Sequence, residues 1–448
     1  MVWRGGGGGR NNNNNNGRGR GGGRHGGGRF GRGGRGRGGD GGGRPLLQVC
    51  RNFATNGNCQ HGDRCNFSHC VQLHASVTAA PPKNNNNNNN NNQNNNYRGN
   101  KSNNGTPVAS IAIWEHQGTI KIFTGSHDGY WRLWNTTNGQ FVQEFEHCMG
   151  GQVDCCQVRG PYLVCGCEAP PKGGTVPVGM THVWDLGSPQ QAPMELVLQN
   201  DGLMPYAHNS AVTALAMVPP DTVVTGSRDG SIRIWKLNST GPTPTVELVS
   251  SLPGHARQVT AVLHIGNTTL WTAGLDHCIR IWDIATQKLL HCISNATNGH
   301  SNAVTGLLSY QAGADLFVIS CSLDQSVKVW NTSSGECVAS ESTGDSGIVC
   351  MCLAQDSVGT DVLLLGTEHG TIQGRSVVGG FANVGPLQSL FSLQYHATGI
   401  GHEGAVQCLI AGPAATFYSG GSDGRMLVMS FPSSIPDLLQ KRGGGQQR

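Results

Sequence analysis

Three cysteines and one histidine near the start of the chain have the spacing of a ligand set for one tetrahedral zinc ion. Cys50, Cys59, Cys65 and His69 form the pattern C-x8-C-x5-C-x3-H within twenty residues. Three thiolates and an imidazole complete the coordination of Zn²⁺, and four protein ligands leave no open position for a reacting water. The residues between the ligands are polar and turn-prone, so they can wrap around an ion but cannot bury a core. The pattern therefore predicts one structural Zn²⁺.

The spacing resembles the CCCH-type zinc finger, a compact RNA-binding module. In that family, two aromatic rings near the second and third cysteines stack on unpaired bases. Phe67 matches one of these positions and His61 occupies the other, so the resemblance implies that both contact single-stranded RNA. Phe53 stands where the family has a ring that packs under the metal loops. Arg51 and Arg64 flank the ligands and are candidate contacts to phosphate or base edges.

The first 44 residues form a strongly cationic segment. They contain ten arginines and one aspartate, which gives +9, whereas the whole chain carries +4 and residues 45–448 therefore carry −5. The segment consists mainly of Arg-Gly-Gly and Asn repeats with almost nothing to bury, which predicts a disordered arm. Guanidinium groups on a flexible backbone bind phosphates and stack on bases with little sequence preference. The arm is a second candidate RNA contact, and the alternative is a solubilising tail.

Changes in composition divide the chain into five predicted segments. They are a disordered Arg/Gly-rich arm (1–45), the zinc finger (46–72), a disordered Asn-rich linker (73–105), a β-rich region (106–432) and a C-terminal tail (433–448). Because the finger has no hydrophobic core of its own, its fold depends on the metal. We therefore expect the substitution Cys59→Ser to unfold the finger and to leave the β-rich region intact.

The β-rich region contains a repeated pattern. Four stretches, TGSHDGYWRLW, TGSRDGSIRIW, TAGLDHCIRIWD and SCSLDQSVKVW, each place an aspartate six residues before a tryptophan. Gly-His pairs recur ahead of several of them. The pattern resembles the WD40 repeat, in which each repeat forms one four-stranded antiparallel blade of a propeller.

The resemblance implies a buried polar network in each complete repeat, made by a histidine, a Ser or Thr, the aspartate and the tryptophan N–H. Three full sets are present: His208, Thr225, Asp229 and Trp235; His255, Thr272, Asp276 and Trp282; His300, Ser320, Asp324 and Trp330. A catalytic triad occurs once in a chain, whereas this pattern recurs, so the sets are structural. No nucleophile elbow, P-loop or dinucleotide fingerprint occurs in the sequence. We therefore expect no catalytic residues.

Counting repeats predicts an all-β, seven-bladed WD40 propeller preceded by the finger and the arm. The sixth and seventh blades are degenerate. His369 and Arg375 replace the aspartate and tryptophan of the sixth, and Met429 replaces the tryptophan of the seventh. Residues 97–107 offer no apolar strand to close the ring. Residues 435–439 are a candidate substitute, so we expect an imperfect seam.

One finger followed by a low-complexity spacer and a propeller resembles the plant and algal zinc-finger CCCH–WD40 (ZFWD) family over residues 46–432. The resemblance implies an RNA-binding adapter with bound zinc, single-stranded RNA and proteins as partners, and no small-molecule substrate. The alternative is a protein-only scaffold, such as a ubiquitin-ligase substrate receptor, in which the finger contacts protein. We find no signal peptide or membrane-length apolar run, and the scattered cysteines suit a reducing compartment. We therefore expect the nucleus, the cytoplasm or both.

Overall fold

The computed structural model describes residues 49–61, 65, 68–80, 105–116, 118–137, 140–171, 174–187, 194–195, 206–238, 245–266, 268–344, 346–377, 387–432 and 434. The predicted arm, most of the predicted linker and all of the predicted tail except Ser434 lie outside these residues. Every described residue belongs to one compact unit, Pro45–Arg448.

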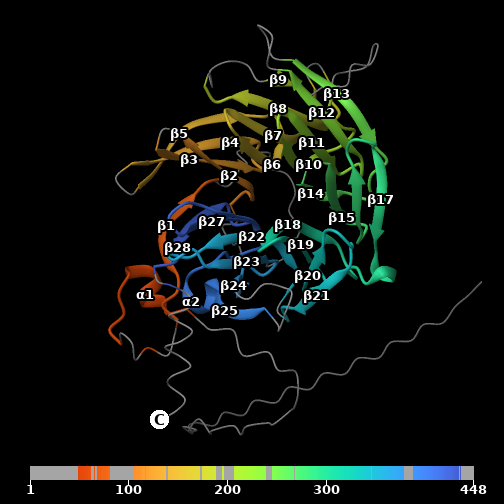
Figure 1. The fold of residues 1–448 in the computed structure, drawn as a ribbon. Coiled ribbons are helices and arrows are strands. Elements are labelled where there is room, and N and C mark those ends of the chain that lie inside the picture. The colour runs from red at the N-terminus through yellow and green to blue at the C-terminus, as the bar shows by residue number, and fades with distance from the viewer. Residues whose placement is uncertain are drawn as a thin grey trace, which may run out of the picture. The chain divides into compact units, whose positions relative to one another are not determined.

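Within the described residues, 28 strands form seven antiparallel sheets of four strands each. The sheets surround a common centre as the blades of a propeller (Figure 1). The predicted seven-bladed, nearly all-β fold is therefore confirmed.

The first three blades follow the chain in order, each beginning with its innermost strand. Blade one contains β2 (Val108–His116), β3 (Thr119–Ser126), β4 (Tyr130–Thr137) and β5 (Gln140–Cys148). Blade two contains β6 (Gln152–Arg159), β7 (Tyr162–Ala169), β8 (Val178–Asp185) and β9 (Met194–Glu195). Blade three contains β10 (Val212–Val218), β11 (Thr222–Ser227), β12 (Ile232–Asn238) and β13 (Thr245–Leu252).

The next three blades repeat this order. Blade four contains β14 (Val259–Ile265), β15 (Thr269–Gly274), β16 (Ile279–Asp283) and β17 (Lys288–Ile293). Blade five contains β18 (Val304–Ala312), β19 (Asp315–Ser322), β20 (Ser326–Asn331) and β21 (Cys337–Ser342). Blade six contains β22 (Ile348–Gln355), β23 (Asp361–Thr367), β24 (Ile372–Ser376) and β25 (Gln388–Leu393).

The seventh blade joins the two ends of the propeller. It contains β26 (Val406–Ala411), β27 (Thr416–Gly421) and β28 (Arg425–Ser430), and its outermost strand is β1 (Gln72–Thr78). β1 runs antiparallel to β28, from the pair Gln72 and Ser430 to the pair Thr78 and Arg425. In Figure 1 the orange β1 lies against the blue strands of this blade. Three short helices complete the described structure: α1 (Arg51–Asn56), η2 (Asn295–Thr297) and α2 (Tyr395–Thr398).

This closure corrects two expectations from the sequence. The strand that completes the ring is β1, which immediately follows the finger, and not residues 435–439, which lie outside the described residues. The disordered linker was expected to begin at residue 73, but residues 73–78 belong to β1. Leu73, Ala75 and Val77 alternate with polar residues, and this period of two is the pattern of a strand buried on one face. This alternation is present in the sequence, but it is short. It also begins soon after the last zinc ligand, so it is easily assigned to the finger or the linker.

The core of the propeller lies between neighbouring blades. Trp282 of blade four, for example, packs with Ile234 of blade three, and Trp330 of blade five packs with Trp271 of blade four. Each of these tryptophans is at most 1% exposed. Because adjacent sheets share these side chains, each blade depends on its neighbours for part of its core.

The helices in the described part of the chain all fall short of the length and apolar character that a membrane crossing requires.

Candidate metal centre and the surfaces around it

The four predicted zinc ligands come together in the structure. The sulfur atoms of Cys50, Cys59 and Cys65 and a ring nitrogen of His69 all lie within 4.8 Å of one another. Cys50 is the N-cap of α1, the next two thiols come from the loops after the helix, and His69 lies three residues before β1. The residues therefore reach one point from a helix end, two loops and the start of a strand.

Local backbone bonds hold this arrangement. The N–H of Cys50 donates to the carbonyl of Ser68 at 2.8 Å, and Val49 forms a parallel bridge with Ser68. α1 is closed at its C-terminus by Gly57, whose φ of 67° is in the left-handed region that glycine adopts without strain. The first and last ligands are thereby fixed on adjacent pieces of backbone.

The geometry fits one zinc ion. Sulfur atoms at about 2.3 Å from a tetrahedral Zn²⁺ lie about 3.8 Å apart. The Sγ atoms of Cys50 and Cys59 are 3.6 Å apart, which is close to this separation. Three thiols so near one another can be thiolates together only around a cation, because their negative charges otherwise repel. The bound ion would neutralise these charges and tie the helix, both loops and the start of β1 together.

Phe53 packs against one of the zinc ligands. Its ring stacks on His69 with a centroid distance of 4.4 Å and an interplanar angle of 11°. This contact fixes the orientation of the imidazole and agrees with the supporting role that the family resemblance implies for Phe53.

The four candidate RNA contacts are placed only in part. His61 lies in an exposed turn, and Arg51 is exposed on α1. The guanidinium of Arg51 lies beside the propeller, because a Cβ built on Gly399 would be 3.2 Å from its Nε. Arg64 and Phe67 lie outside the described residues. The RNA contacts of all four residues remain predictions.

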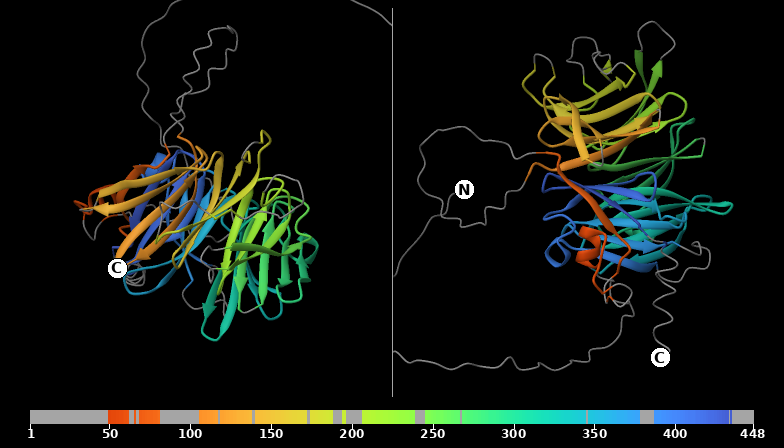
Figure 2. Two further views of the ribbon diagram at one scale, coloured as in Figure 1. Left: turned by 90° about the horizontal axis from the view of Figure 1, so that it is seen from above. Right: turned by 90° about the vertical axis from the view of Figure 1, so that its left-hand side faces the viewer.

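The finger shares a hydrophobic core with the propeller. Val49, Ala54, Cys70 and Val71 are at most 2% exposed, and they belong to one cluster with residues of blades six and seven. Their propeller neighbours include Phe391, Leu393, Ile400, Met429 and Phe431. Figures 1 and 2 show α1 beside the blue strands of blades six and seven. The sequence-based expectation of an independent finger is therefore wrong, because part of its core is supplied by the blades.

The predicted polar networks are present. In blade four, Nδ1 of His255 lies 2.8 Å from Oδ1 of Asp276, and Nε2 lies 2.9 Å from the hydroxyl of Thr272. The indole N–H of Trp282 donates to the same hydroxyl at 3.0 Å. His300 bonds Ser320 and Asp324 in the same way, whereas His208 bonds Thr225 directly and lies 3.7 Å from Asp229. The buried polar groups thus satisfy one another.

Blade seven keeps three members of the network. His402 lies 2.8 Å from the hydroxyl of Ser419 and 2.9 Å from Asp423. Met429, fully buried, occupies the predicted tryptophan position and belongs to the cluster that contains the finger residues. The blade therefore has no indole N–H to complete the set.

Blade six replaces the network with an ion pair. Arg375, in the tryptophan position, is 6% exposed, and its guanidinium lies 2.6 Å from the carboxylate of Glu341 on β21 of blade five. The same carboxylate accepts a bond from the N–H of Leu387 at 2.6 Å. Burial raises the pKa of Glu341 and lowers the pKa of Arg375, and each shift is opposed by the charge of the partner. The sequence indicated only the loss of the tryptophan, because Glu341 lies 34 residues away.

From the titratable groups of these polar networks, we expect the stability of the propeller to decrease in two steps as the pH is lowered. Burial lowers the pKa of His208 and His255 in the folded protein. A histidine with a lowered folded pKa favours unfolding once the pH drops below its unfolded value of about 6.5. We therefore expect the thermal midpoint to decline between pH 7 and pH 5.

A second decline is expected below about pH 4. Burial alone would raise the pKa of the network aspartates, but hydrogen bonds from the histidines and neighbouring donors hold it below the usual value; these residues are Asp229, Asp276, Asp324 and Asp423. Carboxylates with a lowered folded pKa stabilise the fold above their unfolded pKa, and this contribution is lost as the pH falls. Thermal unfolding at pH 7, 5 and 3 tests both ranges, and a midpoint that does not change from pH 7 to pH 5 would contradict the histidine contribution.

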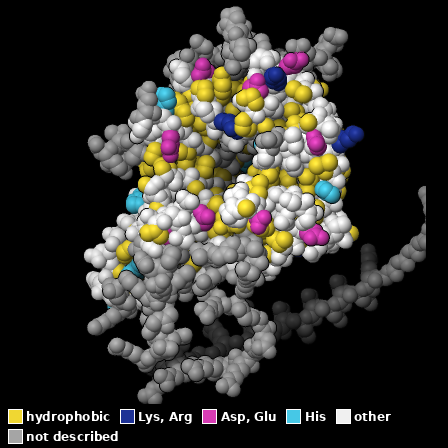
Figure 3. Space-filling model, in the orientation of Figure 1, with side chains coloured by type: hydrophobic (Ala, Val, Ile, Leu, Met, Phe, Trp, Pro, Cys, Tyr) yellow, Lys and Arg dark blue, Asp and Glu magenta, His cyan; other side chains and the backbone are white. Residues whose placement is uncertain are grey.

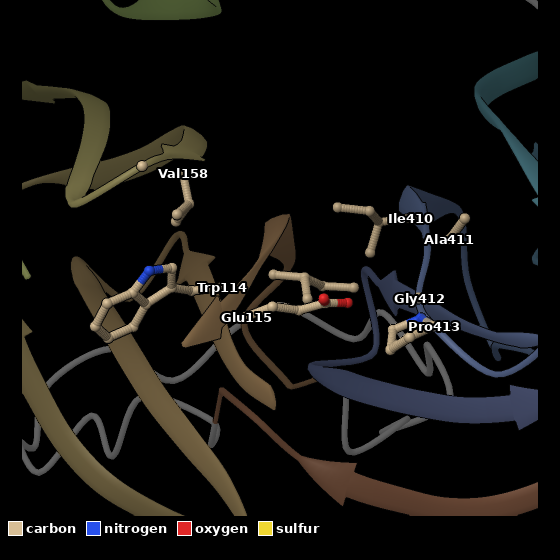
Figure 4. A pocket seen from close by; sticks show the side chains of 9 residues that line it. Trp114, Glu115, Val158, Ile410, Ala411, Gly412 and Pro413 are labelled. Carbon is tan, nitrogen blue, oxygen red and sulfur yellow. The ribbon is translucent and has the colours of Figure 1, made fainter. Parts of the chain in front are cut away.

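The centre of the propeller is hollowed. Figure 3 shows an opening surrounded mainly by hydrophobic side chains. A cavity of about 600 Å³ lies between blades one, two and seven, where Trp114, Val158, Ile410 and Pro413 form apolar walls (Figure 4). Glu115 is the one charged residue among those described that line it. In this hollow one carboxylate therefore lies beside several apolar side chains.

Comparisons with known proteins agree with this architecture. The family description "Zinc finger C-x8-C-x5-C-x3-H type (and similar)" matches residues 47–71. The description "WD domain, G-beta repeat" matches residues 93–135, 203–236, 246–283 and 290–331. The protein thus combines a CCCH zinc finger with a WD40 propeller.

Its relatives include plant zinc finger CCCH domain-containing proteins. Protein 17 of Oryza sativa subsp. japonica is 28% identical over 248 residues, which cover 55% of this chain and 46% of that protein. Protein 59 of Arabidopsis thaliana is 26% identical over 247 residues, or 54% of this chain and 42% of that protein. The chain spans less than half the length of these two relatives.

A solved structure supports the fold alone. The crystal structure of the WD40 β-propeller domain of Doa1 is 18% identical, has a TM-score of 0.53, and covers 74% of this chain and 95% of that one.

Proposed function

We propose that the protein is a non-enzymatic RNA-binding adapter. The zinc finger and the cationic arm contact single-stranded RNA, and the propeller binds protein partners. The observation that carries the proposal is the pairing of a zinc centre, which leaves His61 and Arg51 exposed, with ten arginines in the first 44 residues. Phosphate attraction and base stacking together are the usual means of holding single-stranded RNA.

The two RNA contacts have different roles in this proposal. The arm supplies affinity that depends little on base sequence, since guanidinium groups recognise the phosphates that all RNAs share. The finger supplies a short local preference, because Phe67 and His61 can stack on only a few bases. Arg51 and Arg64 complete the contact by meeting phosphates or base edges beside those rings.

Binding of a labelled single-stranded RNA, followed by fluorescence anisotropy, tests the finger contact. Phe67→Ala is expected to raise the Kd by about 5- to 100-fold, the effect of losing one stacked base. Phe67→Tyr, which keeps the ring, is the matched control and is expected to stay near the original Kd. An unchanged Kd for Phe67→Ala would remove this residue from the interface.

Removal of residues 1–44 tests the arm in the same assay. The logarithm of affinity should fall with the logarithm of salt concentration by about 0.7 per phosphate neutralised in single-stranded RNA. We expect the deletion to weaken binding and to flatten this dependence. If the salt dependence stays the same without the arm, its arginines do not contact phosphate.

The propeller has a candidate protein site in the hollow at Trp114 and Glu115. We propose that it accepts an apolar segment of a partner that carries a basic residue opposite the carboxylate of Glu115.

The reduced state of the cysteines supports an intracellular location, in the nucleus, the cytoplasm or both. None of the sixteen, all of which the structure describes, forms a disulfide.

One observation favours the alternative of a protein-only scaffold. The finger already uses one face for protein contact, because its buried side chains pack on its own propeller. Crosslinking in cells followed by capture of polyadenylated RNA separates the two functions. Recovery of the protein with RNA supports the adapter, and its absence from the captured fraction supports the scaffold.

A further inference from the structure

We infer that the zinc finger has a second task, which is to hold the strand that closes the propeller ring. With Zn²⁺ bound, the finger acts as a clasp: it docks on blades six and seven and fixes the start of β1. This inference concerns packing within the chain and does not depend on the proposed contact with RNA.

The connection between the metal centre and the closing strand is short and buried. His69 is the last ligand, and β1 begins at Gln72. The two residues between them, Cys70 and Val71, are 2% and 0% exposed and lie in the cluster shared with the propeller. No flexible spacer separates finger and strand, so the position of one fixes the start of the other.

Among the described strands, β1 has a partner on one edge only. It is the outermost strand of its sheet and pairs only with β28. All seven of its residues are partly or fully exposed, and Leu73, Ala75 and Val77 are only partly buried. A short edge strand with so little apolar burial is weakly held. Fully buried residues flank β1 at both ends: those of the finger precede it, and Ala79 and Ala80 follow it, with their N–H groups bonded to the carbonyl of Gly424.

The finger packs on the two blades that depart from the repeat pattern. Arg375 of blade six and Met429 of blade seven stand where other blades have an interlocking tryptophan. Val49, Ala54 and Val71 of the finger join the cluster that contains Met429, Phe391 and Phe431. The finger therefore adds apolar contacts where the ring is closed and the usual indoles are absent.

The docking face depends on the metal. α1 has six residues, far fewer than the roughly 12 that an isolated helix needs in water. The residues between Cys59 and Cys65 are polar or glycine, so coordination is what fixes these two ligands. Loss of zinc is expected to release α1 from blades six and seven. β1 then loses the anchor at its start and keeps its pairing with β28 and the anchor at Ala79 and Ala80, so the ring loosens at the seventh blade.

Thermal unfolding of the full chain tests the clasp. Eight of the nine tryptophans lie in the propeller and none in the finger, so tryptophan fluorescence reports the propeller. Removal of zinc with a chelator should lower the midpoint by about 5 °C or more, and added Zn²⁺ should restore it. Hydrogen exchange at residues 72–78 should become faster in the zinc-free protein, while the strands of blades three and four keep their protection.

Three variants separate coordination from docking. Cys59→Ser removes a ligand and should reproduce the effect of the chelator, whereas Cys292→Ser, at an exposed cysteine of β17, should have no effect. Ala54→Asp keeps all four ligands but places a carboxylate in the buried contact, so it should retain one zinc per chain and still lower the midpoint.

The clasp is overturned if the zinc-free chain keeps both its fluorescence midpoint and its slow exchange in β1. None of these measurements involves RNA. Failure of the RNA proposal would therefore leave this result unchanged, and failure of the clasp would leave RNA binding untouched.

Discussion

Replacement of Trp282 by alanine is expected to lower the free energy of unfolding of the propeller by about 3–5 kcal/mol. The indole is 1% exposed and packs in a cluster that joins blades three and four. Its loss opens a cavity between two sheets and removes the N–H that bonds Thr272 at 3.0 Å. Urea unfolding followed by circular dichroism measures the change without relying on the tryptophan signal.

Two further substitutions show which part of the indole matters. Trp282→Phe keeps one apolar ring but loses the N–H and part of the indole volume, so it should cost less than Trp282→Ala, about 1–2 kcal/mol. Trp114→Ala removes an indole from a half-buried position at the central hollow and should cost less than Trp282→Ala. Equal losses for the two alanine variants would show that the network position has no special importance.

The second large effect is expected at the ion pair of blade six. Glu341→Ala leaves the guanidinium of Arg375 buried without its counter-charge, which typically costs about 3–5 kcal/mol. The variant also removes the acceptor for the N–H of Leu387. Urea unfolding followed by tryptophan fluorescence is suitable here, because the substitution leaves every tryptophan in place.

A double variant distinguishes charge burial from general damage. Arg375→Leu combined with Glu341→Ala removes both charges and should recover a large part of the loss, because an apolar side chain can fill the same space. If the double variant is as unstable as the sum of the single ones, the two residues act independently and the interpretation as an ion pair is wrong.

The sequence predicts the seven blades well because most repeats carry a local pattern. Asp276 lies in the turn between β15 and β16, and Trp282 follows six residues later on β16. Patterns of this kind are visible within a dozen residues and recur through the chain. The same is true of the zinc ligands, whose spacing within one short segment is enough to predict the centre.

Contacts between distant segments could not be predicted in this way. The pairing of β1 with β28 joins residues that lie far apart in the sequence, as in the 2.7 Å contact between His74 and Ser430, which are 356 positions apart. The spacing of the zinc ligands does not indicate that Ala54 packs on blades six and seven. Alanine itself gives no signal either, since it is also common in helices that face solvent. A single sequence shows which residues are apolar, but not which distant surface covers them.

The strand order of the seventh blade has a consequence for the synthesis of the chain. β1 leaves the ribosome long before β28 exists, because 356 residues separate His74 from Ser430. At elongation rates of about 5–20 residues per second, this interval is roughly 20–70 s. During that time β1 has no partner strand, and the finger beside it can already bind zinc. The seventh blade thus combines the first and the last translated of the described strands, so β1 must wait for β28 and the ring closes only after β28 has been translated.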